Sequence, residues 1–147
     1  MSITLSKDTK PFAQPINQPI SDRKYRLVEN FIYVYKANDT IFRISVPAGF
    51  ESDGTSSPKW SWSVFERDGI WRAAALVHDY IYHYKGFMPG NSYEFLDGNQ
   101  WKKAPKIAKI EADRIFLQIL RESGVPKFRR QVATAAVLLF GDKAWND

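Results

Sequence analysis

The sequence predicts an α+β fold, in which an N-terminal antiparallel β-hairpin or small sheet packs on about three α-helices. Two observations predict it. Aromatic and β-branched residues dominate positions 25–46, whereas apolar residues recur every three or four positions from residue 70 onward. The chain has 147 residues, of which 44% are hydrophobic, so a single domain with its own core accounts for all of it.

We expect this single domain, residues 1–147, to have three parts. Residues 1–23 contain three prolines among scattered polar residues and are expected to form an extended N-terminal arm. A β part covers residues 24–58, and a helical part covers residues 68–142.

The β part is predicted to contain two strands. Residues 25–35 are rich in tyrosine, valine and isoleucine, and residues 41–46 alternate between two faces. Asn38 and Asp39 form the turn between them, because both residue types tolerate turn conformations. The two strands should therefore pair as a hairpin.

Three helices are predicted from the spacing of apolar residues and from residues typical of helix ends. The first covers residues 70–84, with Asp68 as N-cap and Gly86 as C-cap. The second covers residues 105–123 and is closed by Gly124. Its apolar stripe consists of Ile107, Ile110, Ala112, Ile115, Phe116, Ile119 and Leu120.

The third helix is predicted over residues 126–140, ended by Gly141. Its apolar residues are Val132, Ala135, Ala136, Leu138 and Leu139. Between the first two helices, residues 86–102 are polar and contain proline and glycine, so we expect a loop that forms a wall of a site or is mobile.

Composition excludes some classes of protein. The absence of cysteine rules out disulfides and cysteine-ligated metals, and it fits a reducing compartment. No apolar run is long enough to span a bilayer. The N-terminal residues lack the order of a signal peptide, so we expect the host bacterial cytoplasm or a virion as location, without signal-peptide secretion. The net charge of +5 is typical of a basic surface.

The candidate site centres on the first helix, which carries both histidines of the chain. His78 lies on the helix face that should meet the core, beside Tyr82 one turn later. Asp113 lies in the apolar stripe of the second helix, where a carboxylate needs a partner. If the two stripes face each other, Asp113 can bond one ring nitrogen of His78 and leave the other as a general base.

A divalent cation is the second expectation for this site. Asp79 lies on the adjacent helix face, and the segment from Asp53 to Ser57 concentrates oxygen atoms in a short loop. Oxygen ligands suit Ca²⁺ or Mg²⁺, so Asp79 and Asp53 are the candidate metal ligands. A transition-metal site that joins His78, Asp79 and His83 is a weaker alternative, because residues five apart do not project together.

The same residues admit a structural interpretation. A buried network of histidine, aspartate and tyrosine can simply tie two helices together, since buried ionisable groups mark functional sites only statistically. Both interpretations stay open at this point.

Two stretches carry a resemblance to a known family. They are Asp-Gly-Thr-Ser-Ser-Pro from Asp53 and Ala-Ala-Leu-Val-His-Asp-Tyr-Ile-Tyr around His78. Together with Ala-Asp-Arg-Ile-Phe around Asp113, they resemble the signature of a small tailed-phage and prophage family, known as domain of unknown function thirteen fifty-three. The resemblance covers about residues 50–145 and implies a phage origin with no established activity.

A shorter stretch resembles another family. His78-Asp79 followed by Tyr82 is similar to the His-Asp-x-x-Tyr helix of secreted phospholipases A2, and Asp113 is similar to their second aspartate. The resemblance implies that His78 activates water, that Asp79 binds calcium and that Asp113 orients the histidine. The chain lacks the disulfides and the glycine-rich calcium loop of those enzymes.

The leading hypothesis is a phage-encoded accessory or virion-associated protein with a His–Asp hydrolase site for esters or lipids, in which His78, Asp113 and Tyr82 are the catalytic group. Its alternative is a non-catalytic tail or assembly component that contacts phage structural or host proteins. A binder of nucleic acid or of a host factor ranks last, because its basic residues are not interleaved with aromatic residues. Those residues are Lys102, Lys103, Lys106, Lys109, Arg129 and Arg130.

Overall fold

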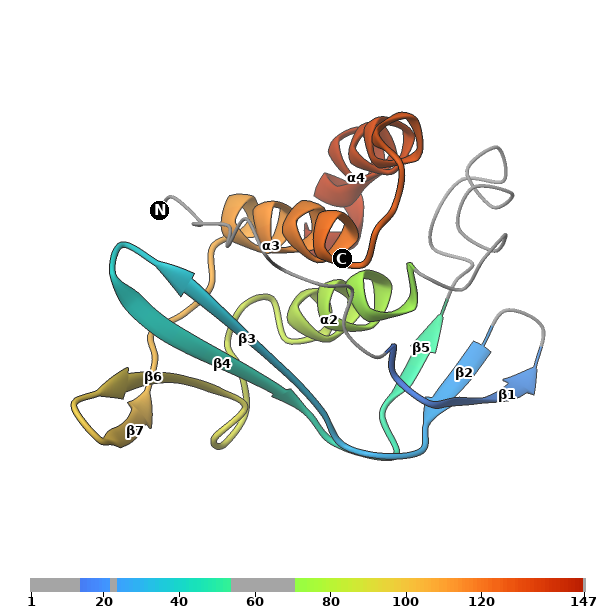
Figure 1. Cartoon of the computed structure of the whole chain (residues 1–147). Helices are drawn as coiled ribbons and strands as arrows, with labels where there is room; N and C mark the ends of the chain where they lie inside the picture. The colour runs from blue at the N-terminus through green and yellow to red at the C-terminus, as the bar shows by residue number, and fades with distance from the viewer. Residues whose placement is uncertain (1–13, 22–23, 54–70, 147) are drawn as a thin grey trace.

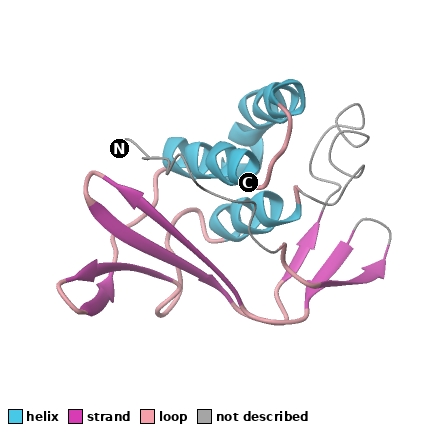
Figure 2. Ribbon diagram, in the orientation of Figure 1, coloured by secondary structure: helices cyan, strands magenta, loops and turns pink. Residues whose placement is uncertain are grey.

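The computed structural model describes residues 14–21, 24–53 and 71–146. In these parts of the chain, two small antiparallel sheets lie beside three helices, which is the predicted α+β class (Figures 1 and 2). The three-stranded sheet has the order β1-β2-β5, and the four-stranded sheet has the order β3-β4-β6-β7. The helices α2, α3 and α4 lie together on one side of the four-stranded sheet.

The predicted hairpin is the centre of the four-stranded sheet. Strand β3 (Phe31–Ala37) pairs with β4 (Thr40–Val46) in register from the Phe31–Val46 pair to the Ala37–Thr40 pair. Asn38 and Asp39 both have positive φ, 50° and 63°, as a two-residue turn of this hand requires. Alternate residues of β3 point into the core, so the expected hairpin is confirmed.

The first predicted strand was too long. Residues 25–35 form two strands that belong to different sheets, β2 (Lys24–Leu27) and β3, and the chain bends at Val28 and Glu29 between them. Asn30 holds this corner, because its Oδ1 accepts a hydrogen bond from the backbone N–H of Ala48 at 2.8 Å. The N-terminal segment, which was expected to be extended, contains strand β1 (Asn17–Ser21), and this strand pairs with β2.

The predicted polar loop between the first two helices is wrong. Strands β6 (Tyr93–Asp97) and β7 (Gln100–Lys103) form a hairpin there, and β6 pairs with β4. The predicted helical part of the chain therefore also contributes two strands to the sheet. The remaining strand, β5 (Glu51–Asp53), pairs with β2 and contacts α2.

Helix α2 (Arg72–His83) confirms the first predicted helix to within a few residues. Its proposed N-cap, Asp68, lies outside the described residues. Gln14 satisfies one N-terminal amide instead, since its Oε1 accepts from the Ala73 N–H at 2.8 Å while its Nε2 donates to Ser123 Oγ at 3.0 Å. A residue of the N-terminal segment thus links the start of α2 to the end of α3 (Lys109–Glu122).

The C-terminal end of α2 requires a glycine. The Gly86 N–H donates to Ile81 O and its carbonyl accepts from the Ile107 N–H, both at 3.0 Å. A Cβ on Gly86, whose φ is +83°, would lie 1.9 Å from Ile107 O. Residues 104–108 have no regular secondary structure, and α3 begins at Lys109 and not at the predicted residue 105.

Helix α4 (Lys127–Asn146) is longer than predicted. Gly141 was expected to end it, but the helix continues through this residue. Gly141 is buried, and a Cβ there would meet the Tyr82 hydroxyl at 2.8 Å. The glycine therefore allows α4 to approach α2 closely and does not terminate the helix.

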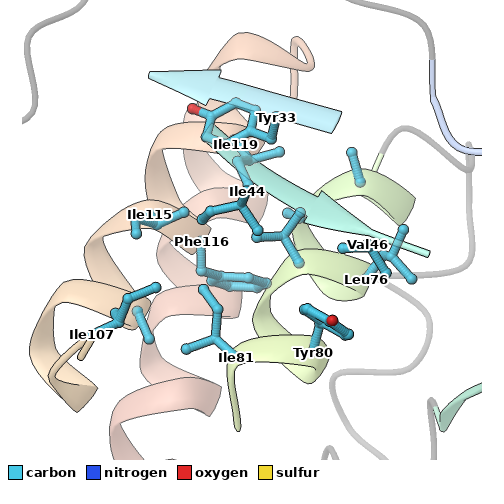
Figure 3. Packing of buried hydrophobic residues seen from close by; sticks show 14 of the residues in the cluster. Tyr33, Ile44, Val46, Leu76, Tyr80, Ile81, Ile107, Ile115, Phe116 and Ile119 are labelled. Atoms are coloured by element: carbon cyan, nitrogen blue, oxygen red, sulfur yellow. The ribbon is translucent and has the colours of Figure 1, made fainter. Parts of the chain in front are cut away.

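The core lies between the helices and the four-stranded sheet (Figure 3). Ile44 and Val46 of β4 face Leu76 and Tyr80 of α2. The residues of the predicted second-helix stripe are buried except Ile110, which is 60% exposed, and Gln118 of α3 is buried in addition. Other members of this cluster are Ile81, Ile107, Ile115, Phe116 and Ile119.

Candidate functional site

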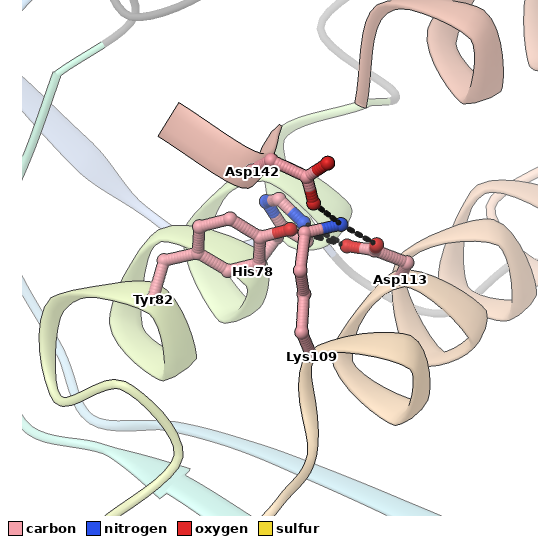
Figure 4. A network of polar contacts seen from close by, with 5 residues as sticks. All are labelled: His78, Tyr82, Lys109, Asp113 and Asp142. Atoms are coloured by element: carbon pink, nitrogen blue, oxygen red, sulfur yellow. Dashed lines mark hydrogen bonds and ion pairs between the residues drawn. The ribbon is translucent and has the colours of Figure 1, made fainter. Parts of the chain in front are cut away.

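Side chains from α2, α3 and α4 meet in one polar cluster, which we call the helical network (Figure 4). Its members are His78, Tyr82, Lys109, Asp113 and Asp142. His78 and Tyr82 lie one turn apart on α2, and Lys109 and Asp113 one turn apart on α3, so each pair shares a helix face. Asp142 follows Gly141 on α4.

Asp113 is the centre of this network. Its Oδ1 lies 3.0 Å from His78 Nε2 and accepts a hydrogen bond from the Tyr82 hydroxyl at 2.6 Å. Its Oδ2 accepts from Lys109 Nζ at 2.8 Å. The predicted bond between His78 and Asp113 is therefore confirmed, and Tyr82, predicted as a partner, joins them.

Burial sets the protonation state of His78. The His78 side chain is 12% exposed and that of Asp113 is 13% exposed. The His78 ring packs at a tilt against two aromatic neighbours, with its centroid 4.0 Å from that of Tyr82 and 4.8 Å from that of Phe116. Desolvation lowers the pKa of His78 below its ordinary value, against the opposing effect of Asp113. The imidazole is consequently neutral at pH 7.

Asp113 stays ionised in this setting. Burial alone would raise the pKa of Asp113, but hydrogen bonds from His78, Lys109 and Tyr82 outweigh it and hold that pKa below its usual value. The two carboxylates near Lys109 likewise raise its pKa despite desolvation. The same Asp113 hydrogen bond raises the pKa of Tyr82, where desolvation is the larger cause.

These charges fix the tautomer of His78. An ionised carboxylate can only accept hydrogen bonds, so a neutral His78 must carry its proton on Nε2, which faces Asp113. The other ring nitrogen, Nδ1, then holds a lone pair. Among the residues that the structure describes, Nδ1 has no hydrogen-bond partner.

Sequence reasoning missed two members of the network. Lys109 stands four residues before Asp113 on the same helix, and the spacing of opposite charges at i and i+4 could have found it. Asp142 is 78% exposed and lies 3.3 Å from Lys109 Nζ. It was missed because the third helix was expected to end before it.

The predicted cation site falls partly outside the described residues. Asp79 is partly buried on α2, whereas the Asp53 side chain and residues 54–57 lie outside what the structure describes. Within the described part, no three histidine, aspartate or glutamate residues are grouped to hold a metal ion. The convergence of Asp79 and Asp53 thus remains a prediction.

The basic residues that suggested a nucleic-acid binder do not form one free set. Lys109 belongs to the helical network, and Lys102 pairs with Asp97 at 2.5 Å. Lys106 lies over the Phe87 ring at 4.5 Å. No helix in the described part of the chain is both long enough and apolar enough to cross a membrane.

A family model described as "Protein of unknown function (DUF1353)" matches residues 25–137. The chain belongs to this family. No curated protein and no solved structure matches it. The DUF1353 match includes His78, Tyr82, Lys109 and Asp113, and it stops before Asp142. The four residues that form the inner part of the network are therefore within the family region, and the exposed carboxylate that completes it is not.

Proposed function

We propose that this DUF1353 protein is a phage-encoded hydrolase of esters or lipids in which His78 is the general base. The observation that supports the proposal is the Nε2 bond of a neutral His78 to an ionised Asp113. This bond leaves Nδ1 as the atom that can take a proton from water. The resemblance of the α2 motif to phospholipases A2 agrees with the same assignment.

The proposed reaction uses one water molecule. Nδ1 of His78 removes a proton from water while the water oxygen attacks the ester carbonyl carbon. The carbon–oxygen bond to the alcohol then breaks, and the imidazolium returns the proton to the leaving oxygen. The products are a carboxylic acid and an alcohol, and His78 ends in its starting state.

The other members of the network set the protonation state and the orientation of His78. The lowered pKa keeps His78 unprotonated at rest, as a base must be, and the positive charge of Lys109 contributes to this lowering. Asp113 orients the ring and faces the positive charge that forms on it during proton transfer. Tyr82 and Lys109 hold Asp113 in place through both carboxylate oxygens.

A divalent cation is part of the proposal. Strand β5, which ends at Asp53, contacts α2, the helix that carries Asp79. Asp79 and Asp53 would be the ligands of Ca²⁺ or Mg²⁺, and the cation would polarise the substrate carbonyl. Titration calorimetry of the protein with CaCl₂ and MgCl₂ tests this step, and no heat of binding at millimolar cation removes the metal from the proposal.

One observation favours a second candidate function, a non-catalytic phage tail or assembly component. Asp113 accepts hydrogen bonds from two helices and its pair with Lys109 reaches Asp142 of a third. A network that satisfies its carboxylate so fully can serve simply to join α2, α3 and α4.

The two candidates are separated by His78→Asn, with His83→Asn as the matched control on the exposed side of the same helix. Hydrolysis of phosphatidylcholine and phosphatidylglycerol vesicles and of p-nitrophenyl butyrate is measured with calcium and with EDTA. We expect His78→Asn to lower activity by about 10²–10⁴-fold, the usual contribution of a general base. His83→Asn should keep activity.

Thermal melting of the same variants completes the test. Activity that is lost with a retained melting temperature supports His78 as the base. Wild-type protein that hydrolyses none of these substrates, together with a His78→Asn variant that melts at lower temperature, rejects the hydrolase and favours the structural candidate.

A further inference from the structure

Helix α4 is apolar on two opposite faces. One face is buried, and Ala133 and Ala136 pack there against the rest of the domain. On the other face, Phe128 is 73% exposed and Leu139 is 70% exposed. A helix of a globular domain normally has one apolar face, so a second one indicates a surface that contacts another molecule.

The spacing of the exposed face is that of a helix–helix seam. Phe128, Val132, Ala135 and Leu139 follow one another at intervals of four, three and four residues. This 4-3-4 pattern is the a/d repeat of coiled coils, in which the seam of one helix packs on a second helix. The position of Leu138, which is 62% exposed, lies beside the seam and widens it.

The seam is complementary to itself. In an antiparallel pair of α4 helices related by a two-fold axis between residues 133 and 134, residue numbers that face each other sum to 267. Phe128 then faces Leu139 of the other copy, and Val132 faces Ala135. A two-fold axis demands this property, because both copies must offer the same surface.

The charges at the ends of the seam agree with the same arrangement. The exposed residue Lys127 lies at the start of α4, and Asp142 lies near its end. In this register Lys127 faces residue 140 of the second copy, two positions from Asp142, whose carboxylate also lies 3.3 Å from Lys109 Nζ of its own chain. The middle of the seam carries no charge.

We propose that the exposed face of α4 binds a second copy of this chain, forming an antiparallel, two-fold symmetric dimer through Phe128, Val132, Ala135 and Leu139. Gly141 and Asp142 lie on the same helix, so the dimer interface borders the helical network. The interface does not depend on the proposed hydrolase activity.

The test is the mass of the full chain by sedimentation velocity over about 1–100 μM. We expect a dimer for the wild type. Leu139→Lys and Phe128→Glu should each weaken it at least about a hundredfold, because each places an unpaired charge against an apolar side chain. Ile32→Lys changes an exposed residue of β3 and is the control that should stay dimeric.

Charge pairing makes the test specific for the two-fold geometry. The double variant Phe128→Glu/Leu139→Lys places opposite charges across the seam at both ends, so it should regain the dimer that each single variant loses. Circular dichroism should show that the single variants are folded, because both changes are at exposed positions.

Three results would overturn the proposal. They are a wild-type protein that is monomeric throughout this range, a dimer that survives Leu139→Lys, and an assembly larger than a dimer, since a two-fold interface closes at two. Flotation of the monomeric wild type with phosphatidylglycerol vesicles, lost in Leu139→Lys, would assign the face to lipid.

Discussion

Two buried polar clusters of this protein can be compared directly, and they use different chemistry. The helical network joins three helices through charged side chains. The second cluster, which we call the tyrosine cluster, lies where the four-stranded sheet meets α3, and consists of Tyr33, Tyr35, Tyr93, Gln118 and Glu122. Each donor of a hydrogen bond in it points to an oxygen atom of another member.

The pairing of the strands places the aromatic side chains of the tyrosine cluster next to one another. The Tyr35 and Tyr93 hydroxyls are 2.6 Å apart, and the Phe42 ring lies between their rings at centroid distances of 5.3 and 5.6 Å. Desolvation is the main cause that raises the pKa of Tyr35, and it raises the pKa of Tyr93 to about 12. No member of this pair changes protonation near neutral pH.

The difference teaches which feature distinguishes a candidate site from a structural contact. Both clusters are buried and hydrogen-bonded. Only the helical network contains an imidazole, a group whose ordinary pKa lies near neutrality. One nitrogen of this imidazole bonds to Asp113, and the network does not use the second nitrogen. Burial of polar groups by itself would have marked both clusters equally.

The largest expected difference between the clusters is in stability. Asp113→Ala removes the acceptor of three hydrogen bonds and leaves Lys109 with the exposed Asp142 as its remaining ion-pair partner, so we expect it to lower the free energy of unfolding by about 2–4 kcal/mol. Tyr35→Phe removes one neutral hydrogen bond and should cost about 0.5–1.5 kcal/mol. Urea denaturation measures both.

Asp97→Ala is the control for this comparison, because its ion pair with Lys102 is exposed at both ends. Its cost should stay within about 0–1 kcal/mol. Equal costs for Asp113→Ala and Tyr35→Phe would show that the helical network is no more strongly coupled than a single hydroxyl pair.

The second prediction uses pH to separate the clusters. The folded pKa of His78 lies below its unfolded value, so its contribution to stability is complete above about pH 6.5 and is lost as the pH falls toward the folded pKa. Asp113 follows the same direction at lower pH, because its folded pKa lies below 3.8.

The stability that the tyrosine cluster contributes depends on pH in the opposite direction. Folded pKa values above 10 mean that stability is complete below about pH 10 and is lost as the pH rises toward the folded values. One proton changes the free energy of unfolding by at most about 1.4 kcal/mol per pH unit. Urea denaturation between pH 5 and pH 11 should lose its acid slope in His78→Asn and part of its alkaline slope in Tyr35→Phe. Unchanged slopes would contradict both assignments.

The smallest predicted effect concerns the contact between α4 and the helical network. Gly141→Ala should gain up to about 1 kcal/mol from helix propensity but places a methyl group against the Tyr82 hydroxyl. We therefore expect Gly141→Ala to destabilise the wild type and to be neutral or stabilising in a Tyr82→Phe background. A double-mutant cycle measures the coupling, and additive values would show that Tyr82 and Gly141 do not touch.

The sequence predicted the contact between His78 and Asp113 better than the bounds of the elements around it. His78 and Asp113 could be paired because each occupies a position that its helix turns toward the core, and the two helices are consecutive. Ile110 was assigned to the same stripe but is 60% exposed, because it shares a face of α3 with the exposed Arg114 four residues later. Periodicity identified the face of α3 but not its first turn.

The β6–β7 hairpin was missed for a different reason. Glycine and proline in residues 86–102 indicated a loop, although Tyr93, Phe95 and Trp101 stand at spacings typical of strands around the Gly98 turn. What decides this hairpin is its pairing with β4, a long-range contact that composition does not encode. The C-terminal end of α4 was predicted wrongly, because a glycine is typical of helix ends. Gly141 instead makes room for Tyr82, and this contact joins residues that are far apart in the sequence.

The contact between Gly86 and Ile107 has a consequence for how the family can vary. The two residues contact each other through their backbones. The two ends of the segment formed by residues 87–106 are therefore held together. The contact between Gly86 and Ile107 thus sets the spacing of α2 and α3, and the number of residues in the segment between them does not. Extra residues grafted at Gly98, the tip of the hairpin, cost only a little loop entropy and should leave the spacing of His78 and Asp113 unchanged. This tip is where insertions can accumulate without disturbing the helices.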